Sequence, residues 1–533
     1  MGKSVFSLFC GAHDCNLSIC IDGKSVLTIE GERLFGNRYF SLQHLLDPEQ
    51  YTNFFTYIKN ILEEEGFSRQ SYDVGLFDWA CEKHLIEFVT NFFKIKEVYH
   101  EDDLTSHHKG HAAGAFYSSG FDQALVFSYD GYGNDGTFCV YEIDKDNPNL
   151  DQINKYENNP IPTKYALFGY FISEIKKNLD FNPHEHYDIL ASAGKIMGLS
   201  SYGSPNKALL KKVFHYFENY PAEPTPAFSL FEDFPFEKDY FKDKESYDLA
   251  FCVQAAFEEC FLNRFRKYFN EEKHKNVCLT GGGALNVVFN EKLSKMYPDT
   301  NFFVPCSPGD SGISYGMIAG YLKKQVVPEL MYSGCPILDK PSLVHVLDHR
   351  PWRKVTPELI AGELKKGKII GICRGDSETG PRALGNRSIL ADPRSHKAKD
   401  IINSKVKFRE WFRPFAPICK EEKASIYFDV SENVSYKYMS FSPPVREEYR
   451  KQLPAITHVD GSSRLQTVSV DQNKFIYEVL DSFEELTGIP VLINTSFNTK
   501  GRAILTRYLE AIKVLDSTGL DAVVLDDYYI YKQ

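Results

Sequence analysis

The sequence of 533 residues lacks three features that would define its class at once. None of its 12 cysteines forms a Cys-x-x-Cys pair, which excludes the usual zinc-finger signatures. No apolar run approaches the ~18 residues needed to cross a bilayer, so we expect no membrane span. The formal net charge is -11, which argues against general binding to nucleic acid or anionic membranes.

The beginning of the chain, "MGKSVFSLFCGAHDC", has no charged lead, no proper apolar stretch and no cleavage site, so we expect no secretory signal. Hydrophobic residues make up 43% and charged residues 25%, as in globular proteins. The length predicts two or more domains. Together these features predict a cytoplasmic enzyme whose reduced cysteines pack as small hydrophobic side chains.

Two segments far apart share a strand-turn-strand pattern. Residues 4–34 have an Asp-Gly turn between alternating runs, which predicts a hairpin, and residues 124–142 repeat the pattern around "YDGYG". A duplication of this kind resembles the actin, heat-shock ATPase and sugar-kinase superfamily at the level of fold, which by itself implies no function.

Residues 323–352 contain several prolines and no strong hydrophobic pattern, and we place a domain boundary near residue 345. The first domain would then cover residues 1–345 and the second residues 346–533. Thr356 and Pro357 predict the start of a helix in the second domain. Residues 218–246, rich in Pro, Phe and acids, are interpreted as a long insertion, and an amphipathic helix is predicted over residues 247–272.

Two histidines in "SHHKGH" have the spacing of one helical turn. His107 and His111 would share one face of a helix, which suits two nitrogen ligands on one divalent metal. The alternative is a pair of half-buried histidines. Asp130 and Asp310, in "YDGYG" and "PGDSG", follow strand-like runs and do not fit a hydrophobic core. Two imidazoles and two carboxylates suit iron or manganese.

The turn "TGGGALN", residues 280–286, places three glycines between a strand and a helix. Such a turn allows backbone amides to approach phosphate oxygens at a helix N-terminus. It lacks the Lys-Ser/Thr of a P-loop and the spacing of G-x-G-x-x-G. A tight turn without a ligand is the alternative.

The densest polar sequence lies in the second domain. "GDSETGPRALGNRSILADPRS" carries Arg382, Arg387 and Arg394, and "KVKFREWFRPFAP" follows with Lys405, Lys407, Arg409 and Arg413. Arginine and lysine side chains suit phosphate and carboxylate oxygens. Because the overall charge is acidic and glycine and proline separate the basic residues, a small phosphate-bearing ligand fits better than RNA. A solvated basic face is the alternative.

Taken together, these segments resemble the NodU-type O-carbamoyltransferases, the family that includes the tobramycin carbamoyltransferase. The matching pieces span nearly the whole chain in the family's order. They include "HHKGHAAGAFYSSGFDQALVFSYDG", "GKIMGLSSYG", "PGDSGISYG", "ETGPRALGNRSILADPR", "KVKFREWFRPFAP", "ITHVDGSSRLQTV" and "VLINTSFNTKG". The C-terminal motifs are very specific, and "GPRALGNRSILADPR" is hard to obtain by chance.

The resemblance implies an α/β and α+β protein with two domains. The first is expected to be an actin-like, duplicated ribonuclease-H-like domain that transfers the carbamoyl group. The second is expected to be a YrdC-like domain that makes carbamoyl adenylate from carbamoyl phosphate and ATP with Mg²⁺. The implied acceptor is a hydroxyl group of a small molecule in natural-product biosynthesis, and the implied metal is Fe²⁺ or another divalent ion such as manganese.

The resemblance also assigns roles to residues. The metal ligands would be His107, His111, Asp130 and Asp310, and His13 in "GAHD" would lie near the acceptor and take its proton. A strand-end histidine held by hydrogen bonds is the alternative for His13. Carbamoyl phosphate and the adenylate would be held by Arg382, Lys407, Arg464, Asn494 and Ser496, and the nucleotide by the turn of Gly281, Gly282 and Asn286.

Two other classes of function stay open at this point. One is carbamoylation of a macromolecule, either tRNA or a protein, and the other is a nucleotide-binding module without catalysis. The cysteine-rich zinc motifs and the acylphosphatase module of hydrogenase-maturation enzymes are absent from this sequence. The sequence leaves open the acceptor, the identity of the metal, and whether the protein forms a homodimer.

Overall fold

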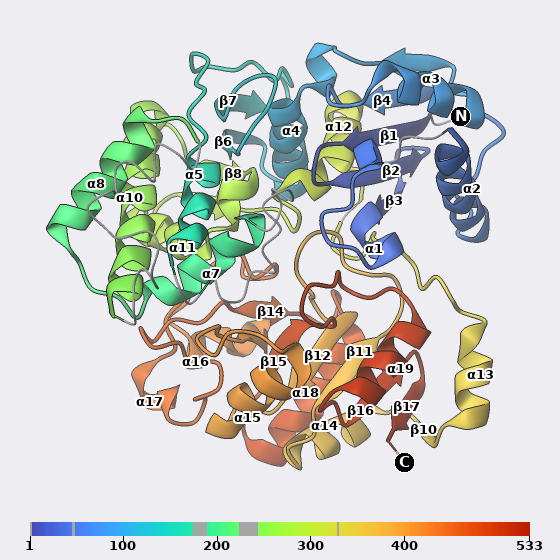
Figure 1. Ribbon diagram of the computed structural model, residues 1–533, viewed down its shortest axis with the longest axis vertical. Coiled ribbons are helices and arrows are strands. Elements are labelled where there is room, and N and C mark those ends of the chain that lie inside the picture. The colour runs from blue at the N-terminus through green and yellow to red at the C-terminus, as the bar shows by residue number, and fades with distance from the viewer. Residues whose placement is uncertain are drawn as a thin grey trace.

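The computed structural model describes residues 3–44, 48–172, 175, 189–222, 244–327 and 330–532. Within these residues the strands form three sheets, two in the upper half and one in the lower half (Figure 1). The mixed α/β architecture expected from the sequence is confirmed. No helix of the described ranges is both long and apolar enough to cross a membrane.

The first sheet has the strand order β3-β2-β1-β4-β5. Its first three strands are antiparallel, and β4 and β5 are parallel to β1. The predicted hairpin turn is confirmed, because Asp22 and Gly23 have φ angles of 56° and 62°, as the tight hairpin turn requires. The strands are β1 (Ser4–Cys10), β2 (Cys15–Ile21), β3 (Ser25–Glu30), β4 (Val74–Phe77) and β5 (Glu97–Tyr99).

The second sheet repeats this arrangement in the order β7-β6-β8-β9. A hairpin, β6 (Gln123–Tyr129) with β7 (Phe138–Asp144), is followed by two strands parallel to β6, namely β8 (Asn276–Thr280) and β9 (Asn301–Phe303). The strand-turn-strand duplication predicted from residues 4–34 and 124–142 is therefore present as a repeated sheet topology.

Two helices, α4 (His107–Ser119) and α12 (Ile313–Leu322), pack together in a core shared by both sheets (Figure 1). Glycines permit their close crossing. A Cβ atom on Gly316 would lie 1.9 Å from the carbonyl oxygen of Gly110, so a side chain at this position would separate the helices. The crossing fixes the N-terminal end of α4, where the two predicted histidine ligands lie.

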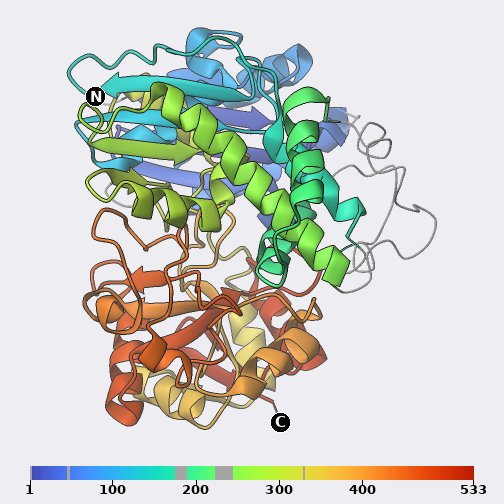
Figure 2. The ribbon, with the colours of Figure 1, turned by 90° about the vertical axis from the view of Figure 1, so that its left-hand side faces the viewer.

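Helices cover the outer face of the second sheet (Figures 1 and 2). The predicted amphipathic helix is confirmed as α10 (Lys244–Tyr268), whose Phe261 and Phe265 pack on Tyr129 and Phe127 with ring centroids 4.1 and 4.8 Å apart. Most of the insertion predicted over 218–246 lies outside the described residues. The other helices here are α5 (Ile161–Leu167), α7 (Leu190–Ser200), α8 (Lys207–Asn219) and α11 (Val287–Met296).

The lower half is one mixed sheet in the order β10-β17-β16-β11-β12-β15-β13-β14. Thr356 caps α14 (Pro357–Lys365) as predicted, its hydroxyl accepting from the amide of Leu359 at 3.2 Å. Since the sheet begins at Trp352, the boundary near residue 345 stays a prediction. The strands are β10 (Trp352–Lys354), β11 (Ile370–Cys373), β12 (Arg387–Ala391), β13 (Ala416–Lys420), β14 (Gln466–Val468), β15 (Val491–Ser496), β16 (Ala522–Leu525) and β17 (Tyr528–Tyr531).

Candidate metal and anion sites

The four predicted metal ligands lie together. His107 and His111 extend from the first turn of α4, Asp130 directly follows β6, and Asp310 begins a short 3-10 turn before α12. One donor atom from each lies within 4.8 Å of the other three. The Nε2 atom of His111 is 3.2 Å from Oδ2 of Asp130 and 3.5 Å from Oδ1 of Asp310, and the Nε2 atom of His107 is 3.6 Å from the same Oδ1.

The cluster has the chemistry of a divalent-metal site. The Nε2 atoms of His107 and His111 are buried and have no hydrogen-bond partner among the described residues, which is costly unless a ligand uses them. Two imidazole nitrogens and two carboxylates suit Fe²⁺ or Mn²⁺. Asp130 is held in place by the amides of Gly131 at 2.6 Å and Gly282 at 2.7 Å, as metal-binding carboxylates usually are.

The N-terminus of α4 is capped by a loop that follows the next strand. The amide of His107 donates to Oδ1 of Asn134 at 3.0 Å, and the amide of His108 donates to Oδ1 of Asp135 at 3.2 Å. Ser106, the residue before the helix, donates its hydroxyl to Asp135 at 3.0 Å rather than capping the helix itself. The sequence analysis missed this cap because cap residues are normally sought next to the helix.

A second group with metal-ligand chemistry, His108, Asp135 and Cys139, lies beside the first. Both ring nitrogens of His108 are already used, Nδ1 with the hydroxyl of Ser128 at 2.7 Å and Nε2 with the carbonyl of Gly136 at 3.0 Å. These bonds leave no free imidazole nitrogen for a metal. His108 instead ties the N-terminal end of α4 to β6.

His13 lies beside the four-residue cluster, in the turn between β1 and β2. Its Nε2 atom is 3.7 Å from Oδ2 of Asp310 and its Nδ1 atom is 3.7 Å from Oδ2 of Asp14. Burial would lower the pKa of His13, but the carboxylates of Asp14, Asp310 and Asp130 outweigh it and raise the pKa to about 9. One third of the side chain is exposed, so the ring is accessible from outside.

The turn of Gly281, Gly282 and Asn286 lies against the same cluster, but its polar groups are engaged within the protein. The amide of Gly281 donates to the carbonyl of Pro308 at 2.7 Å, and that of Gly282 donates to Asp130. Asn286 caps α11 and exchanges hydrogen bonds with Gln254. The tight turn is thus explained by contacts within the chain, and binding of a nucleotide by these three residues stays a prediction.

Lys407 is a buried cation of the lower half. It ends a π-helical turn (Ile402–Lys407), and its Nζ atom donates to the carbonyls of Ser496 at 2.7 Å and Asn498 at 2.9 Å. It also donates to the hydroxyl of Ser496 at 3.1 Å and to the side-chain oxygen of Asn498. Burial, assisted by Arg409, Arg413 and Arg38, holds the pKa of Lys407 well below its usual range.

Arg382 and Arg464 lie in the same electrostatic environment without an acidic partner. Neither has an ion pair or hydrogen bond within the part of the chain that the structure describes. Burial, with Arg413, lowers the pKa of Arg382 to about 10. Burial, with Arg382 and Arg413, holds the pKa of Arg464 well below its usual range. Like charges gathered in a partly dry site favour an anion, so these arginines are a candidate anion site.

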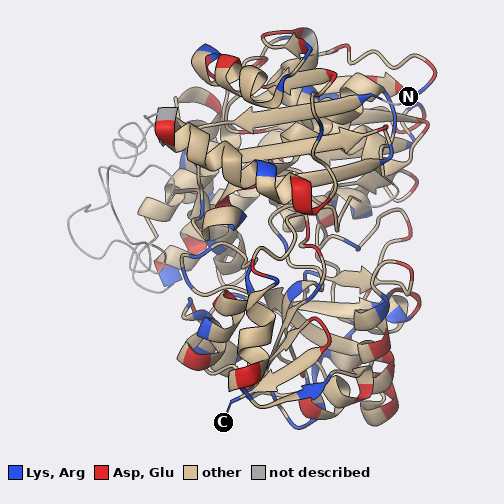
Figure 3. Cartoon of the chain, turned by 90° about the vertical axis from the view of Figure 1, so that its right-hand side faces the viewer, with Lys and Arg blue, Asp and Glu red and all other residues tan. Residues whose placement is uncertain are grey.

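Glu410, a carboxylate beside this cation cluster, is already engaged. Its Oε1 atom pairs with Nζ of Lys195 at 2.9 Å, and its Oε2 atom is 3.6 Å from Arg413. Lys195, in α7, comes from the predicted segment "GKIMGLSSYG" and so links the two halves of the molecule. Figure 3 shows basic residues on loops where these halves meet.

The other two arginines of the "GPRALGNRS" segment have structural partners. Arg387 is fully buried and donates to the carbonyls of Arg374 and Gly375 at 2.9 and 2.7 Å, and Arg394 pairs with Asp392 at 2.6 Å. The loop itself is shaped by Glu378, which accepts from three backbone amides, those of Leu384, Asn386 and Arg387. Arg382, which has no such partner among the described residues, therefore differs from these two arginines.

Asn494 lies on β15 and is completely buried. Its side-chain amide donates to Gln466 at 2.6 Å and to the carbonyl of Ala383 at 3.1 Å. Its Oδ1 atom has no hydrogen-bond partner among the described residues. The structure thus brings Asn494 next to the Arg382 loop, and it adds Gln466, which the sequence analysis did not single out because glutamine has no distinctive spacing.

These observations define an α/β protein with a histidine–carboxylate cluster between two repeated sheets and a separate cation cluster on a third sheet. Two family models match the chain: "Carbamoyltransferase N-terminus" over residues 48–318 and "Carbamoyltransferase C-terminus" over residues 361–532. The chain belongs to the carbamoyltransferase family.

Relatives support this assignment. Nodulation protein NolNO of Sinorhizobium fredii is 32% identical, over 81% of this chain and 64% of the relative. Nodulation protein NolO of Bradyrhizobium diazoefficiens is 31% identical, over 80% of this chain and 79% of the relative. Among solved structures, T. kodakarensis HypF matches with a TM-score of 0.34 and 14% identity, over 62% of this chain and 49% of that protein.

Proposed function

We propose that the protein is an O-carbamoyltransferase that makes carbamoyl adenylate from carbamoyl phosphate and ATP and transfers the carbamoyl group to a hydroxyl of a small-molecule acceptor. The observation that carries the proposal is the presence of two unlike sites in one chain. The lower half holds two cations, Arg382 and Arg464, that have no acidic partner in the described part of the chain. The upper half holds the histidine–carboxylate cluster beside His13.

The fold supports the same division. The repeated strand order of the first two sheets is what an actin-like, duplicated domain requires, and we assign residues 1–345 to it. We assign residues 346–533, with their single mixed sheet, to a YrdC-like domain that forms the adenylate. Fe²⁺ or another divalent ion would bind the upper cluster, and ATP would enter with Mg²⁺.

The first step releases two inorganic anions, as atom balance requires. Water first cleaves carbamoyl phosphate into carbamate and inorganic phosphate. A carbamate oxygen then bonds to the α-phosphorus of ATP as the bond to pyrophosphate breaks. Arg382, Lys407 and Arg464 would stabilise the charge on the phosphates. The free Oδ1 atom of Asn494 and the hydroxyl of Ser496 would orient the amide end of the carbamoyl group.

In the second step the acceptor oxygen bonds to the carbamoyl carbon, and the bond from that carbon to the AMP oxygen breaks. His13 would take the acceptor's proton in its neutral form, since it lies beside the cluster and remains partly exposed. Because its pKa is raised to about 9, the neutral form is the minor one at pH 7, and transfer should become faster as the pH rises toward 9. A divalent metal held by His107, His111, Asp130 and Asp310 would supply Lewis acidity toward a carbonyl or phosphate oxygen.

The direct test is product mass spectrometry. The purified protein would be incubated with carbamoyl phosphate, ATP, Mg²⁺ and Fe²⁺, with and without candidate alcohols. We expect pyrophosphate release that depends on carbamoyl phosphate, and a mass increase of the alcohol by one carbamoyl group. Absence of carbamoyl-phosphate-dependent pyrophosphate release would refute the adenylation step, and transfer to tRNA or protein alone would refute the assignment of a small-molecule acceptor.

Replacing His13 with alanine should separate the two steps. We expect acceptor-dependent transfer to fall about 100-fold, because a positioned acid–base group typically contributes that much. Carbamoyl-phosphate-dependent pyrophosphate release without acceptor should remain unchanged. The comparison variant is His345→Ala, which alters an exposed histidine of α13 (Ser342–His349). Equal loss of both activities in His13→Ala would contradict the division of labour.

Replacing His111 with alanine should remove the metal. This ring contacts both carboxylates of the cluster, so its loss is expected to weaken binding of Fe²⁺ or Mn²⁺ by at least about 100-fold. The measurement is metal content after anaerobic dialysis against each ion, with His345→Ala again as control. One tightly bound equivalent in His111→Ala would show that the metal, if any, binds elsewhere.

A further inference from the structure

Two cysteines enclose the turn that carries His13. Cys10 is the last residue of β1 and Cys15 is the first residue of β2, and the pairing of the strands places them directly opposite each other. Both thiols are free and buried. Neither cysteine belongs to the metal cluster or to the cation cluster described above, so the pair has no role in either site.

The position of this pair in the ladder suits a disulfide. Opposite residues of an antiparallel ladder alternate between hydrogen-bonded and non-hydrogen-bonded pairs. The amide of Asp22 donates to the carbonyl of Lys3 at 3.2 Å, so these two residues form a hydrogen-bonded pair. The alternation makes Cys10 and Cys15 a non-hydrogen-bonded pair, whose Cα atoms are typically about 4.5 Å apart. Disulfides form at Cα separations of about 4.4 to 6.8 Å, so little movement of the strands is needed.

The two thiols also share one face of the sheet. Cys10 and Cys15 belong to the same hydrophobic core, together with Leu8 of β1. Cys20, the other cysteine of β2, lies opposite Val5 in the core on the other face of the sheet. Cys20 therefore has no cysteine opposite it, which makes it a matched control for the pair.

The two thiols differ in reactivity. Hydrogen bonding with the thiol of Cys15 lowers the pKa of Cys10, and the backbone of Leu42 and Gln43 lowers it further, against the effect of burial. The same contact with Cys10, together with burial, raises the pKa of Cys15 well above its usual range. Because the thiolate is the nucleophile, Cys10 is suited to react first and Cys15 to resolve the product.

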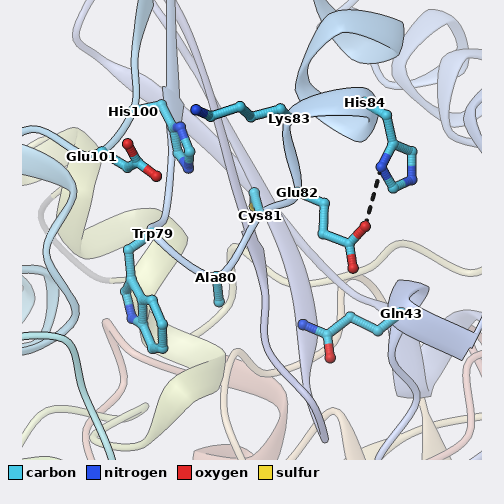
Figure 4. Close-up of a pocket in the computed structure, with 9 residues that line it drawn as sticks. All are labelled: Gln43, Trp79, Ala80, Cys81, Glu82, Lys83, His84, His100 and Glu101. Atoms are coloured by element: carbon cyan, nitrogen blue, oxygen red, sulfur yellow. Dashed lines mark ion pairs between the residues drawn. The ribbon is translucent and has the colours of Figure 1, made fainter.

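A pocket of about 440 Å³ provides a route for a small oxidant (Figure 4). Gln43 and Cys81 line it, and both are attached to the end of β1. The side chain of Gln43 donates to the carbonyl of Cys10 at 3.2 Å, and the thiol of Cys81 donates to the carbonyl of Leu8 at 3.5 Å. A molecule slightly larger than water therefore needs only a local opening of the pocket wall to reach Cys10.

We propose that Cys10 and Cys15 are a redox pair that hydrogen peroxide converts to a disulfide, and that this disulfide controls the His13 turn. The Cys10 thiolate bonds to one peroxide oxygen as the O–O bond breaks and hydroxide leaves, which gives a sulfenic acid. The Cys15 sulfur then bonds to the Cys10 sulfur as the S–O bond breaks, and the hydroxyl leaves as water with the proton of Cys15. In total, two thiols and one peroxide give one disulfide and two waters.

The disulfide would close a ring around residues 11–14. Because a sulfur–sulfur bond is only about 2 Å long, oxidation draws the two strand ends together. The turn moves with them, and it holds His13, whose Nε2 atom is 3.7 Å from Asp310. Asn16, next to Cys15, donates to the carbonyl of Asp310 at 3.0 Å, so the same movement reaches the metal cluster. Oxidation should therefore lower carbamoyl transfer and spare adenylation, a consequence that rests on the proposed function.

The first test maps the disulfide in the full chain, treated with a chelator so that iron does not decompose the peroxide. The protein is exposed to hydrogen peroxide, alkylated under denaturing conditions and digested with trypsin. Residues 4–24 form one tryptic peptide, which contains Cys10, Cys15 and Cys20. We expect it to carry one alkyl group, on Cys20. Alkylation of all three thiols, or linkage of Cys10 to Cys81 in another peptide, would overturn the proposal.

The second test measures activity after the peroxide is removed and metal is restored. Oxidised wild type should lose transfer to the acceptor by at least about 10-fold, because a displacement of about 1 Å can cost about 100-fold in rate. Pyrophosphate release that depends on carbamoyl phosphate should remain, and dithiothreitol should restore transfer. Cys10→Ala and Cys15→Ala should each be insensitive to peroxide, whereas Cys20→Ala should respond as the wild type does.

The two proposals fail separately. If the disulfide forms and transfer is unchanged, control of the His13 turn is wrong and the transferase activity stands. If neither the reduced nor the oxidised protein shows carbamoyl-phosphate-dependent pyrophosphate release, the proposed function is wrong. The mapped disulfide would then still identify Cys10 and Cys15 as a site of oxidation.

Discussion

Lys407→Ala is expected to lower carbamoyl-phosphate-dependent pyrophosphate release by at least about 1000-fold, the scale seen when a cation that stabilises phosphoryl charge is removed. Lys407 is the buried member of a cluster in which three arginines raise the cost of its charge. A phosphate anion relieves that repulsion, and the relief is largest where charge accumulates during adenylation. The same substitution should leave metal binding at the upper cluster unchanged.

Two comparisons make this result specific. Lys405→Ala changes an exposed lysine of the same π-helical turn and should keep nearly full activity. Lys407→Met keeps the length of the side chain without its charge, so its inactivity would separate lost charge from lost packing. Phosphate should raise the Tm of the wild type and not that of Lys407→Met, because only the intact cluster binds the anion. Full activity in Lys407→Met would contradict the role assigned to the charge.

The metal cluster was predictable from sequence because local patterns determine most of it. The i, i+4 spacing places His107 and His111 on one helical face, and Asp130 follows a strand whose end is visible in the apolar pattern. Asp310 is brought in by the close crossing of α4 and α12, which depends on Gly110 and Gly316. The duplication of the sheet could be anticipated as well, since two hairpins have similar patterns.

The supports of these sites could not be predicted in the same way. The cap of α4 by Asn134 and Asp135 joins segments 27 residues apart. The amide of Gly282 is used by Asp130, 152 residues earlier, so a turn that was predicted to suit a phosphate also holds a carboxylate. Such contacts depend on tertiary packing, and neither partner has a local signature. Sequence therefore indicated the ligand residues more completely than the contacts that hold them.

A longer connection joins the two halves through a buried ion pair. Glu30, at the end of β3, and Arg33, in α1 (Gly31–Phe35), pair at 3.2 Å. Glu30 accepts the amide of Gly380 at 2.7 Å, and Arg33 donates to the carbonyl of the same residue. Gly380 has a φ of 94°, and a Cβ atom there would lie 2.5 Å from the carbonyl of Cys306.

This contact fixes the loop that carries Arg382, two residues after Gly380. Cys306, whose carbonyl contacts Gly380, precedes Asp310 by four residues. Gly380 therefore packs between the segment that carries Arg382 and the segment that carries Asp310. The carbonyl of Arg33 additionally accepts from Thr506 at 2.9 Å, and the carbonyl of Leu34 accepts from Arg507 at 2.8 Å, so α1 is attached to the lower half at Gly380 and at residues 506–507. We expect Glu30 and Arg33 to position Arg382 without contacting a substrate.

Glu30→Ala should destabilise the protein by about 3–5 kcal/mol, because it leaves the buried guanidinium of Arg33 without its partner. Denaturant unfolding measures this loss. Removing the exposed ion pair between Lys340 and Glu65, at 2.6 Å, with Lys340→Met should change stability by less than about 1 kcal/mol.

A double variant, Glu30→Gln with Arg33→Met, distinguishes positioning from stability. Replacing both members of a buried pair with neutral side chains removes the unpaired charge, so most of the stability should return. The peptide of Gly380 would still lack its guanidinium donor, and KM for ATP should therefore stay raised while metal binding remains normal. If the double variant recovers both stability and wild-type KM, the pair serves only folding, and the position of Arg382 depends on the three-amide contact of Glu378.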